Sequence, residues 1–187
     1  MIHLVDSAVF PEELFQVFIV NESPPIGNPQ FGFAYNATRP DRSFYLIYAH
    51  GLKEYLEAGK DFDIHCMLEL ETLTREYQKG IIHRFTEEEF LLGASVHEVR
   101  HRMQFCSGVQ LFDPSHTFQI SRCQFWTNVQ AKAYENDPNG SYEFDAKFFE
   151  HYAAHEFKQD RLKLNREDLR NLINMTVEQF LEREKNR

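Results

Sequence analysis

The run His97-Glu98-Val99-Arg100-His101 holds the residue types of a hydrolytic metal site, at a spacing that a helix can use. Histidines four residues apart lie on one helix face, one turn apart, so both imidazoles can reach a single metal ion. Glu98 lies about 80–100° round the helix from them, where it can hold a metal-bound water and accept its proton. The pattern predicts zinc ligands at His97 and His101, with Glu98 as general base.

A helix is expected to carry this run. Thr86 can cap the N–H of Glu89, and the Glu89 side chain can reach back to the N–H of Thr86, which forms a capping box. Three acidic residues in the first turn suit the positive end of the helix dipole. The helix is predicted to run to about Phe105 and to stop near Ser107-Gly108.

The faces of this predicted helix differ in character. Apolar residues recur at spacings of four, three and four, which forms one stripe: Leu92, Val96, Val99 and Met103. His97 and His101 fall nearly opposite that stripe. Gly93 and Ala94, one turn earlier, leave room beside the histidines. The helix is therefore expected to pack its apolar stripe on a core and to turn its histidines towards a cleft.

Two histidines leave a tetrahedral ion one protein ligand short. The best candidate is Glu143, in the first turn of a second predicted helix that Ser141 can cap. Small Ala146 in that helix would let the two helices approach closely enough for a carboxylate to span the gap. Three rivals for the third ligand remain open from the residues alone: Glu150, Asp145 and His116.

The two motifs together resemble those of a known family. A His-Glu-x-x-His helix followed by a helix with Glu-x-x-Ala-x-x-Phe is similar to the gluzincin metallopeptidases, especially their small bacterial and phage-type members. The likeness covers roughly residues 69–157 and rests on two short motifs. It implies a zincin-like core, peptide-bond hydrolysis, Glu98 as base and Zn²⁺ held by His97, His101 and Glu143. It also implies that an edge strand binds extended peptide.

The chain departs from the family pattern at several places. A long insert separates the motifs, Lys147 stands where an acidic or amide residue is common, and Glu150 where a small one is common. Arg100 and Arg102 flank the second histidine, where uncharged residues are usual, and Arg102 could pair with Glu98 on a solvated face. These arginines motivate a second hypothesis, a catalytically silent metallopeptidase-like domain that binds a partner protein. A structural protein with incidental histidines is a third.

A peptidase also needs a donor to the oxyanion that forms during hydrolysis. The candidates are His151, His155, Tyr134 and Tyr142. His151 and His155 are themselves four residues apart, but no glutamate separates them in the hydrolytic pattern.

Composition narrows the class of protein. The chain has 187 residues, 42% of them hydrophobic, which is enough for a sizeable core and argues against disorder. Its net charge is −9 and it shows no basic stripe, so nucleic-acid binding is disfavoured. Three cysteines without Cys-x-x-Cys spacing predict buried thiols in a reducing compartment. There is no leader-like start and no long apolar run, so the expected location is cytoplasmic, away from membranes.

The remaining pattern predicts strands first and helices later. Residues 14–20, 31–35 and 43–49 are rich in aromatic and β-branched residues and predict a small antiparallel sheet. Helices are expected over 52–58, 62–79, 117–135 and 165–184, with Asn165 as the cap of the last. The expected fold is α+β. It forms a single domain over 1–187, with a sheet-forming part at about 1–50 and a mainly helical part at about 51–187.

Overall fold

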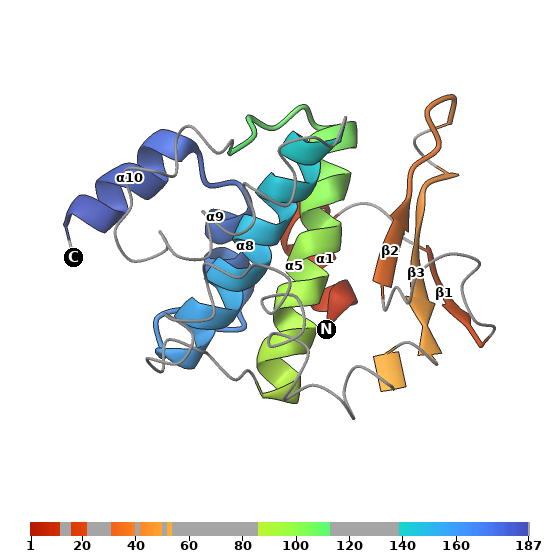
Figure 1. The fold of residues 1–187 in the computed structure, drawn as a ribbon, viewed down its shortest axis with the longest axis horizontal. Helices are drawn as coiled ribbons and strands as arrows, with labels where there is room; N and C mark the ends of the chain where they lie inside the picture. Colours follow the sequence, from red (N-terminus) through yellow and green to blue (C-terminus); the bar gives the residue numbers. More distant parts are fainter. Residues whose placement is uncertain are drawn as a thin grey trace, which may run out of the picture.

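The computed structural model describes residues 1–11, 16–21, 31–39, 42–49, 52–53, 86–112 and 139–186. These ranges form a small sheet on one side and a group of helices on the other, which confirms the α+β class (Figure 1). In chain order the elements are α1 (Ile2–Val9), β1 (Gln16–Val20), β2 (Phe31–Ala34), β3 (Phe44–Tyr48), α5 (Glu87–Cys106), α8 (Gly140–Lys158), α9 (Arg166–Ile173) and α10 (Val177–Lys185). The helices expected over 62–79 and 117–135 lie outside the described residues, as does most of 52–58.

The three strands lie where their alternation predicts them, but their pairing is mixed. β3 occupies the centre of the sheet, with β1 parallel to it on one side and β2 antiparallel to it on the other. The expected all-antiparallel sheet is therefore wrong for the β1–β3 pair. Side-chain periodicity identifies a strand but not its neighbours, and consecutive strands often fail to pair. Here β3 inserts between the two strands that precede it.

The N-terminal part is not all sheet, because the chain begins with a helix. α1 buries Ile2, Val5, Asp6 and Ala8, a helical spacing of three, one and two. It packs against α9 and α5, so the first residues belong to the helical core. The expectation of a purely sheet-forming part over 1–50 is corrected in this respect.

α5 forms as its sequence predicts. The Thr86 hydroxyl accepts from the N–H of Glu89, and the Glu89 carboxylate accepts from the N–H of Thr86, so the capping box is confirmed. The helix ends at Cys106, and Gly108 follows in the left-handed region with φ of +61°, which glycine adopts without strain. The four stripe residues Leu92, Val96, Val99 and Met103 are all buried in the core.

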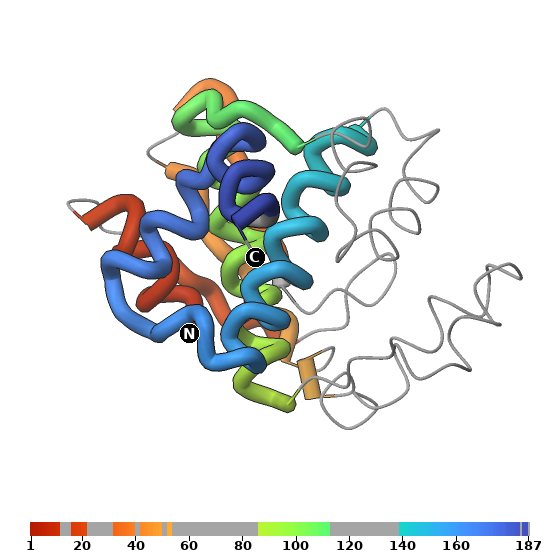
Figure 2. The backbone as a smooth tube through the Cα atoms, turned by 90° about the vertical axis from the view of Figure 1, so that its left-hand side faces the viewer, coloured from red at the N-terminus to blue at the C-terminus, as the bar shows by residue number. Residues whose placement is uncertain are grey.

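α8 packs along the length of α5, as both views of the backbone show (Figures 1 and 2). The close approach depends on Gly93. A Cβ atom at this position would lie 2.9 Å from the carbonyl oxygen of Glu150 and 3.6 Å from the Cβ of Ala154. α8 begins at Gly140 after Asn139, with no side-chain cap, so the predicted cap at Ser141 is wrong.

The C-terminal segment is two helices rather than the one expected over 165–184. Asn165 caps α9 by accepting from the N–H of Asp168, as predicted. The chain then leaves the helix, and Thr176 forms a second capping box with Gln179 that starts α10. The hydroxyl of Thr176 thus accepts from the backbone at the start of a new helix, which favours the end of α9 over its continuation. α10 places Phe180 against the rings of Phe148 and Tyr152 on α8 and against the ring of Phe112, which follows α5.

Two compositional expectations can be compared with the described residues. Cys106 is exposed at the end of α5, which contradicts the expected burial of this thiol, while Cys66 and Cys123 lie outside the described ranges. In the part of the chain that is described, the helices are all too short or too polar to cross a lipid bilayer.

Candidate metal centre

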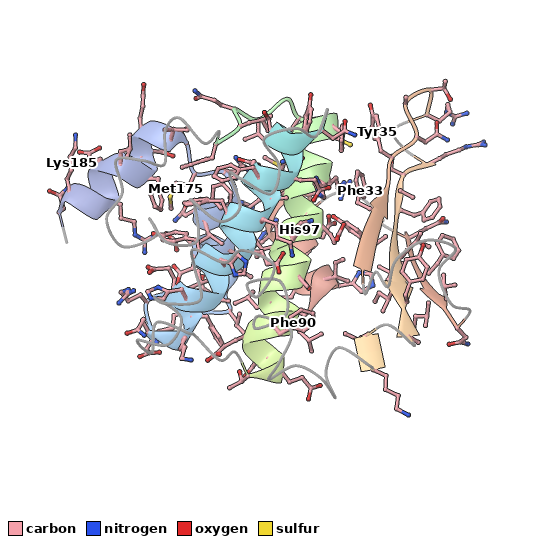
Figure 3. The ribbon with its side chains drawn as sticks, viewed as in Figure 1. Phe33, Tyr35, Phe90, His97, Met175 and Lys185 are labelled. Atoms are coloured by element: carbon pink, nitrogen blue, oxygen red, sulfur yellow. The ribbon has the colours of Figure 1, made fainter. Side chains whose placement is uncertain are left out.

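His97 and His101 project from α5 towards α8 and meet Glu143 from its first turn (Figure 3 labels His97 between the two helices). The two Nε2 atoms are 3.0 Å apart. Oε1 of Glu143 lies 3.2 Å from Nε2 of His101, and Oε2 lies 3.7 Å from Nε2 of His97. Two imidazole nitrogens from α5 and a carboxylate from α8, which presents a different oxygen to each ring, therefore lie close enough together to hold one metal ion.

The spacing of these atoms suits a small tetrahedral ion. With metal–ligand bonds of about 2.0–2.1 Å, two ligands of a tetrahedral zinc ion lie roughly 3.3 Å apart. The two Nε2 atoms, 3.0 Å apart, and the Nε2 of His101 and Oε1 of Glu143, 3.2 Å apart, are close to that value, and the second oxygen of Glu143 lies 3.7 Å from Nε2 of His97. Glu143 is the most exposed of the three, with 37% of its side chain accessible, so the site opens to solvent on its side. Three protein ligands and an open position are the pattern of catalytic zinc.

Glu98 lies beside the converging atoms without joining them. Its Oε1 is 4.0 Å from Nε2 of His97, and its side chain is buried. Burial raises the pKa of Glu98 above its usual value, as do Glu143 and Glu150, while His97 and His101 act in the opposite direction. A carboxylate with a raised pKa close to the ligand atoms is suited to accept a proton there and to give it back.

The electrostatics of the cluster favour a cation. Burial alone would lower the pKa of His101, but its contact with Glu143 and the nearby carboxylate of Glu98 raise it. The same contact with His101 lowers the pKa of Glu143 despite partial burial. These contacts stabilise the protonated form of His101 relative to the neutral form, as expected of a pocket that attracts positive charge.

The count of charges among the described residues also favours a cation at this site. Glu98, Glu143 and Glu150 contribute three carboxylates, against one ammonium group from Lys147. With neutral imidazoles and all four groups ionised, three negative charges minus one positive charge leave an excess of two. A divalent cation would cancel that excess, which a monovalent ion would not.

Glu150, a rival third ligand, lies on the other side of His97. Its Oε2 is 2.9 Å from Nδ1 of His97, at an angle outside that of a hydrogen bond, and 2.6 Å from Nζ of Lys147. Burial opposes ionisation of Glu150, but Lys147 and His97 together lower its pKa. An ionised carboxylate beside Nδ1 favours the proton on that nitrogen, which leaves Nε2 of His97 as the metal-binding atom.

The other two rivals for the third ligand position are Asp145 and His116. Asp145 is fully buried and accepts hydrogen bonds from Arg100 at 2.7 and 3.0 Å, so its oxygens are already used. His116 lies outside the described residues. Of the predicted candidates, the structure thus brings together His97, His101, Glu143 and Glu98.

The two arginines of the motif face away from the ligand atoms. Arg100 pairs with Asp145, and Arg102 donates to both oxygens of Asp6 at 2.7 and 2.8 Å. The hydroxyl of Tyr45 also donates to Asp6, at 2.7 Å, so this ion pair joins α5, α1 and β3. Both arginines are buried, which contradicts the expectation of a solvated Arg102 face. Their charges are met by carboxylates and do not oppose a cation at the histidines.

The candidate oxyanion donors are scattered. His151 follows Glu150 on α8 and, in its protonated form, helps to lower the pKa of that carboxyl group. His155 lies further along α8, 3.5 Å from the buried carboxylate of Glu156. Tyr142 adjoins Glu143 and stacks on Phe105, with their ring centroids 5.4 Å apart. Tyr134 lies outside the described ranges.

An exposed row of aromatic rings borders the site. Phe105 stacks between Tyr35 and Tyr142, and its ring also lies 6.3 Å from that of His101. Each of these three aromatic residues is 37–41% exposed, although they come from separate elements. Such a row gives the rim beside His101 an apolar character.

The sequence interpretation missed two side chains at this centre. Gln104 accepts a hydrogen bond from Nδ1 of His101 at 2.8 Å, and Lys147 neutralises Glu150. Gln104 is one turn after His101, so helix periodicity could have placed it beside that ring. Lys147 was noted only as a departure from the family pattern.

Comparisons of this chain with protein-family models, with curated proteins and with solved structures find no match. The geometry of the site is therefore the basis for the functional argument.

Proposed function

We propose that this protein is a zinc-dependent hydrolase that acts on peptide bonds, with ligands His97, His101 and Glu143. The observation that carries the proposal is the convergence of the two Nε2 atoms and the Glu143 carboxylate within 3.0–3.7 Å, beside buried Glu98. The resemblance to gluzincin metallopeptidases supports the choice of substrate. The cytoplasmic location stays a proposal that rests on cysteine usage.

The roles of the residues follow from their positions. Bound zinc would polarise the scissile carbonyl and lower the pKa of a coordinated water towards ~7. Glu98, close to the ligand atoms, takes one proton from the attacking water and later returns it to the leaving amine. Its raised pKa suits both steps, because a carboxylate must hold the proton between them. Glu143 leaves the solvent-facing side open for the substrate.

The sheet offers a place for the peptide backbone. Within the described sheet, β2 is an edge strand, and it packs against α5 (Figure 1). An extended peptide can add to such an edge by main-chain hydrogen bonds. We therefore propose β2 as the strand that aligns the substrate, since β3 is central and β1 lies on the far side of it.

The test is zinc content per chain, measured by elemental analysis after dialysis, together with hydrolysis of a fluorogenic peptide library. Wild type is expected to hold about one zinc ion, and H97A, H101A and E143A to lose it. E98Q should keep the metal and lose hydrolysis. H3A, which removes an exposed histidine of α1, is the matched control and should retain both. Unchanged zinc content in the three ligand variants would contradict the proposal.

The alternative, a catalytically silent domain that binds a partner protein, has less support than the hydrolase. It was motivated by Arg100 and Arg102, and both guanidinium groups are held by buried carboxylates. Turnover that a chelator and E98Q each abolish would exclude it. Zinc binding without turnover of any peptide would favour it.

A further inference from the structure

A chain of buried hydrogen bonds leads from the metal-binding face into the core. It starts at Nδ1 of His101, which lies 2.8 Å from Oε1 of Gln104. An amide oxygen only accepts, so the proton of this hydrogen bond must lie on Nδ1 of His101. A neutral His101 then has its lone pair on Nε2, the atom directed at His97 and Glu143.

The orientation of the Gln104 amide is fixed by its other end. Nε2 of Gln104 donates to the carbonyl oxygen of Tyr142 at 2.9 Å and to Oδ2 of Asp145 at 2.7 Å. Both partners are acceptors, so a flipped amide would place its oxygen against two oxygens. Only one orientation satisfies all three contacts.

Asp145 is itself held rigidly. Besides Gln104, it accepts from Nε and Nη2 of Arg100 and from the backbone N–H of Phe112 at 2.8 Å. Arg100 donates in addition to the carbonyl oxygens of Ile173 and Gln110, at 2.6 and 3.0 Å. Both charged side chains have no exposed surface, so rearrangement would leave a buried charge without its partner.

The guanidinium group of Arg100 has a further constraint. Its Cζ atom lies 4.1 Å from the ring centroid of Phe149, which covers one face of the planar group. Arg100 thus contacts α8, the end of α9 and the segment after α5. Any change in how these parts pack would move Asp145, then Gln104 and then the ring of His101.

We infer that Gln104, Asp145 and Arg100 are positioning residues, which fix the tautomer and the ring orientation of His101 so that Nε2 is ready to bind metal. The tautomer part stands by itself, and only the effect on zinc rests on the proposed function. For His97 the corresponding contact is weaker, because Oε2 of Glu150 lies 2.9 Å from its Nδ1 but at an unfavourable hydrogen-bond angle.

The test compares wild type with Q104M, which keeps the length of the side chain and removes its three hydrogen bonds to His101, Tyr142 and Asp145. Asp145 retains Arg100 and the Phe112 N–H in this variant, so the fold is expected to survive. Q159M, at an exposed position after α8, is the matched control. The first readout is the protonated nitrogen of His101, from ¹⁵N NMR of the metal-free protein in alkaline buffer. The second is zinc affinity by competition with a chromophoric chelator.

We expect the proton on Nδ1 in wild type and Q159M, and a shift towards Nε2–H in Q104M. Zinc affinity should fall about 10–100-fold in Q104M alone, as is usual when the partner of a ligating histidine is lost. A proton on Nε2 in wild type, or an unchanged tautomer and affinity in Q104M, would overturn the inference. A tautomer shift without zinc binding by wild type would uphold the positioning role and reject the proposed function.

Discussion

The two polar faces of α5 differ in how their charges are met. The first is made up of Arg100, which pairs with Asp145 of α8, and Arg102, which pairs with Asp6 of α1 on another side of the helix, and each guanidinium has a carboxylate oxygen at 2.7 Å. On the face towards α8, His97 and His101 meet three carboxylates and one lysine. We name them the closed face and the open face. The side chains of the closed face are at most 5% exposed, whereas Glu143 on the open face is 37% exposed.

This contrast separates buried charges that serve the fold from buried charges that serve binding. A buried pair with matched charges and full hydrogen bonding is complete without any ligand, although it adds little to stability over an apolar pair. A buried group with excess charge is incomplete until a counter-ion arrives. The closed face therefore fixes the geometry of α5, and the open face is the part of the helix where the proposed cation would bind.

The closed face should respond most strongly to loss of one partner. R100M leaves Asp145 ionised and buried, so we expect the free energy of unfolding to fall by roughly 3–5 kcal/mol in urea titrations. E143Q on the open face removes a half-exposed carboxylate and should change the stability of the metal-free protein by less than about 1 kcal/mol. Equal effects of the two substitutions would remove the distinction between the faces.

The open face should respond most strongly to metal. Zinc at a hundred times its dissociation constant should raise the free energy of unfolding by about 2.7 kcal/mol, because the ion binds the folded state. A chelator should reverse the gain, and H101A should not show it. If magnesium, which prefers six oxygen ligands, stabilised the protein equally, the charge argument would hold but the tetrahedral site would not.

A substitution at Gly93 tests how closely α8 must pack against the open face of α5. G93A places a methyl group 2.9 Å from the carbonyl oxygen of Glu150, so α8 must shift, at a cost of about 1–3 kcal/mol in stability. Zinc affinity should fall as well, because Glu143 and Glu150 move with α8. G32A is the control, since nothing lies within 4 Å of a Cβ there. Unaltered zinc affinity in a destabilised G93A would mean that the ligands tolerate helix movement.

The N-terminal end of α5 belongs to neither face, and a substitution there should have the smallest effect on stability and on zinc affinity. T86A removes the side-chain acceptor of the capping box, so we expect a loss of about 1 kcal/mol in thermal or urea unfolding. Zinc affinity should be unchanged, because the cap lies three turns from His97. A marked fall in affinity would show that fraying of the helix reaches the open face.

Local signals in the sequence predicted much of this arrangement. The capping box at Thr86, the stripe from Leu92 to Met103, the three strands and the cap at Asn165 depend on neighbours within a few residues, and each is confirmed. The same applies to the one-turn spacing of His97 and His101. Placement of Glu143 beside them needed the second motif and a family resemblance as well.

Long-range partners could not be predicted in this way. Arg102 suggested a pair with Glu98 four residues earlier, yet it donates to Asp6, 96 residues away. The central position of β3 and the split between α9 and α10 depend likewise on what packs against each segment. A single sequence specifies charges and periodicities, but the partner of a buried charge is decided by the tertiary fold.

The docking of α1 has a consequence for biosynthesis. Asp6 pairs with Arg102, 96 positions later in the chain. The carbonyl oxygen of Ala8 accepts from Nε of Arg170, 162 positions further along the polypeptide. Contacts of such large sequence separation slow folding, because a long loop must close before they form. On the ribosome, α1 cannot complete its docking until Arg170 has emerged. We expect nascent chains released before residue 170 to be far more sensitive to protease than chains that include α9.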